Sequence, residues 1–185
     1  FGPFLNITKN PSWIVVNNLP NTIDNVNIIK HKLSVNWKEV KKNIHSLTQQ
    51  KPHAIAIISV GYDPTPEIKN IRVERAAVNQ EFGADNTNDF KFGNKIFKDG
   101  KPQLNLNPKL LDNNLTIDSL VTELRKKSKV TNIIAGTALD FKTSAGTYIC
   151  NETFYSVLYY TAKTKSDTYV TFIHIPTFKN VKQAD

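Results

Sequence analysis

The chain has 185 residues and a formal net charge of +8, and 39% of its residues are hydrophobic. This length suits one domain with a sizeable core, and no apolar run in the sequence is long enough to span a membrane. The single cysteine, Cys150, excludes an internal disulfide framework and any metal site built from several cysteines. The basic residues are scattered and no nucleic-acid-binding motif accompanies them, so nucleic acid is not an expected partner.

The amino-terminal segment predicts a helix followed by a strand. Asn10 can cap a helix that begins at Pro11, and Pro20 marks its end. The predicted apolar face of this helix consists of Ile14, Val15 and Leu19. Residues 26–33, with the sequence VNIIKHKL, are typical of a strand.

The middle of the chain continues this alternation. Residues 36–50 predict a helix, because their apolar side chains form one stripe at helical spacing. Residues 53–61 (HAIAIISVG) are a short apolar run ending at glycine, which is typical of a buried parallel strand. Residues 71–79 alternate apolar and charged side chains and predict another strand. The polar, Asn-rich segment 80–113 lacks periodicity and predicts an irregular excursion.

The last third predicts two more helices and two more strands. Thr116 can cap a helix that runs to about Lys127, and residues 132–139 (NIIAGTAL) are typical of a buried strand. Residues 150–163 predict a helix, and residues 168–176 predict a final strand that Pro176 ends. Strands therefore alternate with helices, which indicates a three-layer α/β/α sandwich with a mostly parallel, mixed and twisted sheet.

Three residues could carry chemistry at the carboxyl ends of these strands. Cys150 lies at the predicted start of a helix, where unpaired backbone N–H groups stabilise a thiolate. His174 lies near the end of the last strand, and Glu74 is a charged residue in an apolar strand. A cysteine peptidase or amidase needs such a set: a thiolate, an imidazole that activates it, and a carboxylate that holds the imidazole.

Each of the three residues also has a purely structural interpretation. A lone cysteine is commonly a small buried hydrophobe, and His174 could be a core histidine bonded to the backbone. Glu74 could pair with a neighbouring arginine, Arg72 or Arg75. The other histidines (His31, His45 and His53) lack the spacing of metal ligands, so no metal site is expected.

Four separated blocks, in the same order, resemble the pyroglutamyl peptidase I family of cysteine peptidases. The opening FGPFLNITKNPSWIVVNNL is similar to the family's Phe-x-Pro-Phe turn followed by Asn-x-Ser and a helix. ISVGYDPTPEIKNIRVERAAVN (58–79) resembles its glycine-ended strand followed by Glu-Arg-x-Ala-x-Asn. SAGTYICNETFY (144–155) and FIHIP (172–176) resemble its Cys-Asn block and its final Phe-Ile-His-x-Pro.

The resemblance implies a triad and a reaction. Cys150 matches the family's nucleophile, His174 its base and Glu74 its acid. The implied activity is removal of an amino-terminal pyroglutamyl residue from a peptide through a thioester acyl-enzyme, without a metal or organic cofactor. An amidase with altered acyl specificity and a non-catalytic binding protein of the same fold are the alternatives.

The resemblance also implies a small apolar slot for the flat, neutral lactam ring. The backbone N–H of Cys150, at the helix start, is an expected oxyanion donor. The residues expected to line the slot are Phe1, Phe4, Tyr62, Tyr148 and Ile149.

This chain departs from the family pattern at three places. YDPTPE follows Gly61, where many members have Gly-Gly-Arg, and GADN (83–86) is the only trace of the family's Arg-Ile-Pro-Asp-Asn segment. The family also has a strand before Phe1, so residues 1–185 are expected to form a single peptidase domain without that first strand. By resemblance, the expected location is cytoplasmic, and the expected assembly is a homo-oligomer, either dimer or tetramer.

Overall fold

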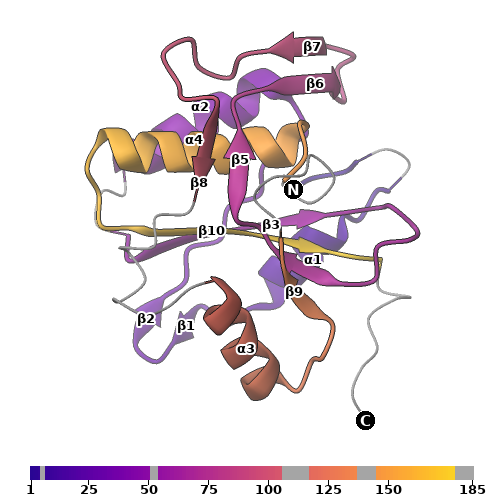
Figure 1. Ribbon diagram of the computed structural model, residues 1–185, viewed down its shortest axis with the longest axis vertical. Coiled ribbons are helices and arrows are strands. Elements are labelled where there is room, and N and C mark those ends of the chain that lie inside the picture. Colours follow the sequence, from indigo (N-terminus) through magenta and orange to yellow (C-terminus); the bar gives the residue numbers. More distant parts are fainter. Residues whose placement is uncertain (5–6, 51–53, 106–116, 137–144, 178–185) are drawn as a thin grey trace.

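The computed structural model describes residues 1–4, 7–50, 54–105, 117–136 and 145–177 (Figure 1). The helices in this part of the chain are α1 (Pro11–Asn18), α2 (Trp37–Gln50), α3 (Ile117–Ser128) and α4 (Ile149–Lys163). The strands are β1 (Thr22–Ile23), β2 (Val26–Asn27), β3 (Ala56–Tyr62), β4 (Ile71–Val73), β5 (Ala76–Val78), β6 (Glu81–Ala84), β7 (Phe90–Asn94), β8 (Gln103–Asn105), β9 (Ile133–Ala135) and β10 (Tyr169–Ile175).

A mixed sheet forms the middle layer, with the strand order β3-β10-β4-β9. The pairs β3/β10 and β4/β9 are parallel, whereas β10 and β4 are antiparallel. Helices α2 and α4 cover one side of this sheet, and α1 and α3 lie on the other (Figure 1). The predicted three-layer α/β/α fold with a mixed sheet is therefore confirmed.

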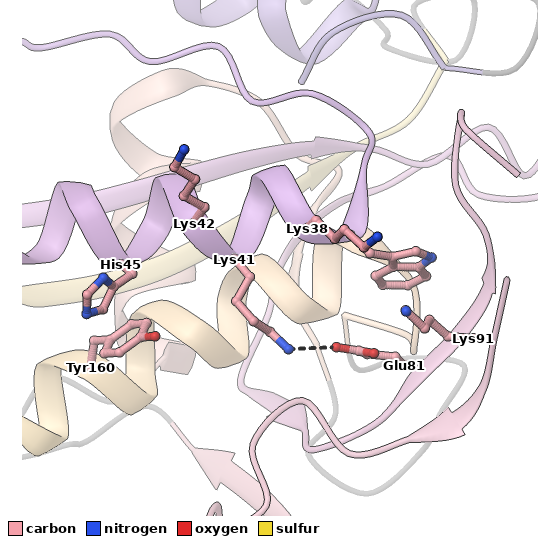
Figure 2. Close-up of a pocket in the computed structure, with 8 residues that line it drawn as sticks. Lys38, Lys41, Lys42, His45, Glu81, Lys91 and Tyr160 are labelled. Carbon is pink, nitrogen blue, oxygen red and sulfur yellow. Dashed lines mark hydrogen bonds and ion pairs between the residues drawn. The ribbon is translucent and has the colours of Figure 1, made fainter. Parts of the chain in front are cut away.

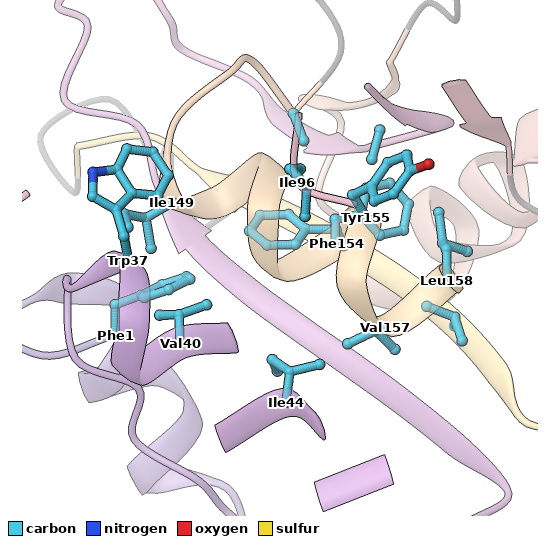
Figure 3. Packing of buried hydrophobic residues seen from close by; sticks show 14 of the residues in the cluster. Phe1, Trp37, Val40, Ile44, Ile96, Ile149, Phe154, Tyr155, Val157 and Leu158 are labelled. Carbon is cyan, nitrogen blue, oxygen red and sulfur yellow. The ribbon is translucent and has the colours of Figure 1, made fainter. Parts of the chain in front are cut away.

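The larger hydrophobic core lies between helices α2 and α4 and the sheet (Figure 3). From α2, Trp37, Val40 and Ile44 point towards α4, which contributes Phe154 and Val157. All five side chains are at most 4% exposed. Burial on this scale stabilises the fold by roughly 1.5–3 kcal/mol for each large aliphatic side chain. The start of α4 is thus held rigidly against the sheet.

The helix at Pro11 is confirmed, but its surroundings differ from the prediction. The Asn10 side chain caps α1 by accepting a hydrogen bond from Ser12 N at 3.0 Å. The buried residues of this helix are Pro11 and Ser12, and the predicted apolar face is wrong, because Ile14, Val15 and Leu19 are exposed.

The predicted strand 26–33 is wrong. Only Val26–Asn27 forms a strand, which pairs with the two residues of β1 in a short hairpin. Asp24 and Asn25 turn this hairpin with φ values of 47° and 64°, a geometry that asparagine and aspartate tolerate. Beyond Asn27 the chain has no sheet partner in the described region, so its β-type composition does not form a strand.

Two further strand predictions are changed by the sheet. The strand predicted at 53–61 is present as β3 and is parallel to β10, but the prediction that it is buried is wrong: it lies at the edge of the sheet within the described residues, and Ile58 is 60% exposed. The predicted strand 71–79 divides into β4 and β5 at residues 74–75. The reason is that β4 pairs with β10 and β9, whereas β5 turns away to pair with β8.

The prediction that residues 80–113 are irregular is wrong for residues 81–94 and 103–105, and residues 106–113 lie outside the described residues. Residues 81–94 form the hairpin of β6 and β7, and residues 103–105 form β8. The predicted elements at 36–50, 117–127, 150–163 and 168–176 are confirmed as α2, α3, α4 and β10. The strand predicted at 132–139 is present as β9 over residues 133–135, and residues 137–139 lie outside the described residues. Thr116, the predicted cap of α3, also lies outside them.

Candidate active site

Cys150 is placed in the first turn of α4 by the turn that precedes the helix. Gly146 has φ of 77°, a conformation that favours glycine, and Tyr148 is extended immediately before the helix begins. The first N–H groups of a helix have no intrahelical acceptors, so the helix start favours a negatively charged sulfur. Cys150 is partly buried, and its thiol is free.

The Asn151 side chain fixes this helix start to the neighbouring strand. Its Oδ1 accepts from Val78 N at 2.9 Å, and its Nδ2 donates to Val78 O at 2.8 Å and to Gln80 O at 3.0 Å. Asn151 is fully buried, and its amide pairs with both main-chain groups of Val78 in β5 and with the carbonyl of Gln80 just beyond it. The position of the neighbouring thiol is therefore set by two elements rather than one.

His174 lies near the carboxyl ends of the parallel strands β3 and β10. In the sheet register it is opposite Gly61 of β3 on one side and Arg72 of β4 on the other. This edge of a parallel strand pair is where α/β proteins commonly collect their ligand-binding groups. The sheet register thus brings together residues 61, 72 and 174, which are far apart in the sequence.

Glu74 holds the His174 ring from the break between β4 and β5. Its Oε1 lies 2.7 Å from Nδ1 of His174, and the carboxylate is fully buried. Burial lowers the pKa of His174, but the charge of Cys150 and its hydrogen bond to the ring, followed by Glu74, outweigh burial and raise this pKa to about 9. The surroundings of His174 therefore favour the protonated form of its imidazole.

Gly61 allows the strand to pass directly beneath the thiol. A Cβ at this position would lie 2.8 Å from the Phe172 ring and 3.0 Å from Sγ of Cys150. Real Cβ atoms essentially never approach other atoms at 2.8 Å, so any larger residue would displace the ring or the sulfur. The glycine that ends the apolar run is therefore required for close packing against the site.

Arg72 and Asp63 extend the line of charged groups behind Glu74. Nε of Arg72 lies 3.2 Å from Oε1 of Glu74, and its Nη2 lies 2.7 Å from Oδ2 of Asp63. Burial lowers the pKa of Arg72, but Asp63 and Glu74 outweigh it and raise this pKa above its usual value. Burial raises the pKa of Asp63, but the bonds to Thr65 and Arg72 outweigh it and keep this pKa below its usual value.

A cavity of about 160 Å³ opens onto Cys150 and His174. It is smaller than a drug-sized site, which occupies roughly 300–1,000 Å³. Residues from five parts of the chain line it: Phe1, Phe4, Asn10, Val35, Tyr62, Asp63, Pro64, Ala145, Tyr148, Ile149, Cys150 and His174. The five residues expected to contact the ring all lie on this list, and Glu74 lies behind His174 rather than in the cavity.

Tyr148 joins the cavity wall to the β6–β7 hairpin. Its hydroxyl donates to Ala84 O at 2.7 Å, and the Trp37 ring meets its ring edge-on at 5.2 Å. Gly83, with φ of 114°, leaves room for the ring, since a Cβ there would lie 3.1 Å from Tyr148. Burial first, then the charges of Asp85 and Cys150, raise the pKa of the phenol to about 12, so it stays protonated.

A larger hollow of about 460 Å³ lies on the other side of Trp37, over helices α2 and α4 (Figure 2). Lys38, Lys41, Lys42 and His45 project into it from α2, and Lys41 is paired with Glu81 at 3.1 Å (Figure 2). No cysteine, serine or threonine is among the described residues that line this hollow. In the described part of the chain, no group of three or more His, Cys, Asp or Glu side chains could hold a metal ion.

The sequence interpretation missed two groups at the site. Asp63 lines the cavity, but its position in the YDPTPE segment carried no signal beyond a turn. Asn151 was noticed only as part of the Cys-Asn block, without its role in tying α4 to β5. Arg72 was considered as a neighbour of Glu74, and the structure places it there.

Comparison with known proteins identifies the family. The model of the pyroglutamyl peptidase family matches residues 1–185. The pyrrolidone-carboxylate peptidase of Brachyspira hyodysenteriae is 34% identical over 179 residues, which cover 95% of this chain and 80% of that protein. That of Thermococcus onnurineus is 30% identical over 176 residues, with the same coverage.

Solved structures agree with this fold. The pyrrolidone carboxyl peptidase of Pyrococcus furiosus superposes with a TM-score of 0.80 at 22% identity, covering 98% of this chain and 80% of that one. The enzyme from Thermococcus litoralis superposes with a TM-score of 0.79 at 24% identity, covering 95% and 73%. The chain belongs to the pyroglutamyl peptidase family of cysteine peptidases.

Proposed function

We propose that Cys150, His174 and Glu74 are the catalytic triad with which this chain removes amino-terminal pyroglutamate from peptides. The observation that carries the proposal is that Glu74 Oε1 holds Nδ1 of His174 at 2.7 Å while His174 and Cys150 line the same cavity. Such an arrangement fixes the ring orientation and leaves its second nitrogen facing the sulfur.

The reaction proceeds in two steps. The Cys150 thiolate attacks the exocyclic carbonyl carbon of the pyroglutamyl residue, and the oxyanion that forms is stabilised by backbone N–H groups at the start of α4. The tetrahedral intermediate collapses as His174 gives its proton to the departing amine, which leaves a thioester on Cys150. Water then attacks the thioester, His174 accepts its proton, and pyroglutamate and the thiolate are released.

The cavity supports a small, neutral acyl group. Phe1, Phe4 and Ile149 supply apolar surface, and Tyr62 and Tyr148 supply rings with polar ends. A volume of about 160 Å³ leaves little room for anything larger than one residue beside the thiol. We therefore place the lactam ring in this cavity and the rest of the peptide outside it.

The test is release of a fluorescent amine from a pyroglutamyl amide by the wild-type chain, Cys150→Ser and His174→Gln. Both variants are expected to lose at least about a thousandfold in kcat/KM. His45→Gln, which changes a histidine of α2 remote from the thiol, is the matched control and is expected to keep full activity. A well-folded wild type that hydrolyses a prolyl amide but not a pyroglutamyl amide would refute the substrate assignment.

The homo-oligomer and the cytoplasmic location remain predictions from the family resemblance. In the part of the chain that the structure describes, no helix is both long enough and apolar enough to cross a membrane.

A further inference from the structure

A single oxygen atom of Glu74 receives two cationic donors. Oε1 lies 2.7 Å from Nδ1 of His174 and 3.2 Å from Nε of Arg72. The other oxygen, Oε2, has no hydrogen-bond partner within the described residues. Glu74 is fully buried and Arg72 is 5% exposed, so little water screens the charges at this junction. The positive charge of Arg72 therefore offsets part of the negative charge that Glu74 presents to His174.

Arg72 is in turn held from its far side. Its Nη2 lies 2.7 Å from Oδ2 of Asp63, just beyond the end of β3. The backbone of Thr65 fixes Asp63 by donating to its Oδ1 at 3.0 Å. The guanidinium thus bridges two carboxylates, one beside the triad and one at the rim of the cavity. Only a planar side chain with several fixed donors can bridge in this way, and lysine cannot reproduce it.

We propose that Arg72 and Asp63 are positioning residues for the peptidase reaction, with Arg72 fixing Glu74 and setting how strongly Glu74 holds a proton on His174. Asp63 offsets part of the positive charge of Arg72 and so weakens the effect of Arg72 on Glu74. This inference rests on the proposed catalytic roles of Cys150, His174 and Glu74. It assigns a function to the segment after Gly61, where this chain departs from the family pattern.

The two charges predict opposite effects on the imidazolium. Without the Arg72 charge, Asp63 and Glu74 together hold the proton more strongly, and the pKa of His174 rises. Without the Asp63 charge, the positive charge of Arg72 is uncompensated beside Glu74, and the pKa of His174 falls. A charge at this range changes the pKa of a buried group by about one unit or more. An ion pair that served only to stabilise the fold would not produce shifts of opposite sign.

Other charged groups near the triad are unchanged in such variants. From α4, Cys150 lines the same cavity as His174, and Tyr148 presents its phenol from the turn before this helix. Arg75, although next to Glu74 in the sequence, pairs with Asp118 of α3 instead. Any shift can therefore be attributed to the substituted charge.

The experiment measures kcat/KM for the pyroglutamyl amide from about pH 5 to pH 10 in four chains: wild type, Arg72→Gln, Arg72→Lys and Asp63→Asn. The alkaline limb, where His174 loses its proton, is expected to move up by about one pH unit in Arg72→Gln and down in Asp63→Asn. Arg72→Lys retains the charge and is expected to keep the wild-type limb while losing about tenfold in kcat. Arg75→Gln and Asp118→Asn are the matched controls and are expected to leave the profile unchanged.

A second readout does not depend on the substrate. Titration of the His174 imidazole by NMR reports its pKa directly in each chain, and the same opposite shifts are expected. Wild type that is inactive on the amide but shows these shifts would refute the proposed function and support the charge coupling. Active wild type with limbs and imidazole titrations that are unchanged in Asp63→Asn and Arg72→Gln would overturn the positioning roles. If Arg72→Gln fails to fold, the direction in which the pKa of His174 shifts in Asp63→Asn alone tests the proposal.

Discussion

Glu152, two residues after Cys150, is expected to make the protein less stable as the pH rises. Its side chain is fully buried, and neither carboxylate oxygen has a hydrogen-bond partner within the described residues. Lys41 lies 3.9 Å from it but donates instead to Glu81 at 3.1 Å and to the Ile96 carbonyl at 2.9 Å. Burial, followed by the charge of Glu81, raises the pKa of Glu152 from 4.5 to about 8.

The direction of this pH dependence follows from the numbers of protons that the folded and the unfolded chain bind. Between pH 4.5 and about 8 the folded chain keeps a proton on Glu152 that the unfolded chain has released. The free energy of unfolding therefore falls by about 1.4 kcal/mol for each pH unit in this window. His174, whose pKa is raised from 6.5 to about 9, also contributes stability that is lost as the pH rises, but only above pH 6.5. Between pH 5 and 6.5 the decline, about 2 kcal/mol, belongs to Glu152.

Glu152→Gln isolates this contribution because an amide of the same shape cannot ionise. The free energy of unfolding is measured by urea titration at about pH 5, 6.5 and 8, with tryptophan fluorescence reporting on the buried Trp37. Wild type is expected to lose about 2 kcal/mol between the first two pH values, and the variant less than about 0.5 kcal/mol. Glu123→Gln, an exposed position on α3, is the matched control and is expected to follow wild type.

Parallel curves for wild type and Glu152→Gln from pH 5 to 6.5 would refute the reasoning. Such a result would mean that Glu152 is already ionised in the folded protein at pH 5, with Lys41 as a true partner. A loss of several kcal/mol in the variant at pH 8 would lead to the same conclusion, since removing one member of a buried ion pair is strongly destabilising.

Two further substitutions test the packing around the thiol. Gly61→Ala is expected to lower kcat/KM at least about tenfold, because its Cβ would meet the Phe172 ring at 2.8 Å and Cys150 Sγ at 3.0 Å; wild-type activity would contradict this. Asn151→Ala is expected to reduce the free energy of unfolding by about 1–3 kcal/mol in urea titrations, because it removes the side-chain acceptor of Val78 N and the donor to Gln80 O, whereas Val78 O keeps its bond from Gln80 N; a loss below about 0.5 kcal/mol would argue against that role.

Local patterns were sufficient to predict most of the elements that carry the site. The helix containing Cys150 and the strand containing His174 both appear where the sequence predicts them, because their side chains are buried in one continuous core. The strand predicted at 26–33 stops at Asn27 because a strand needs a partner strand, and residues 28–33 have none among the described residues. Composition reports only the preference of a segment, whereas pairing decides its conformation.

The site's fine geometry depends on sheet register, which the sequence does not encode locally. The strand predicted at 71–79 breaks at residue 74 because β4 and β5 belong to different sheets. Register also places His174 directly opposite Arg72, which is far away in the sequence. The link from Asp63 to Arg72 could not be predicted, since it depends on where the chain leaves β3.

Glu74 can both pair with a neighbouring arginine and hold the His174 ring, because its carboxylate contacts Arg72 and His174 together. Side chains two residues apart in a strand lie on the same face, so Arg72 and Glu74 project together towards His174. A carboxylate that orients an imidazolium must stay ionised, yet Glu74 is fully buried, where an uncompensated charge is costly. Arginine suits this position because it keeps its charge at every relevant pH and can share a single oxygen with the histidine. The ion pair with Arg72 is therefore compatible with the catalytic role that we propose for Glu74 and offsets the cost of burying its charge.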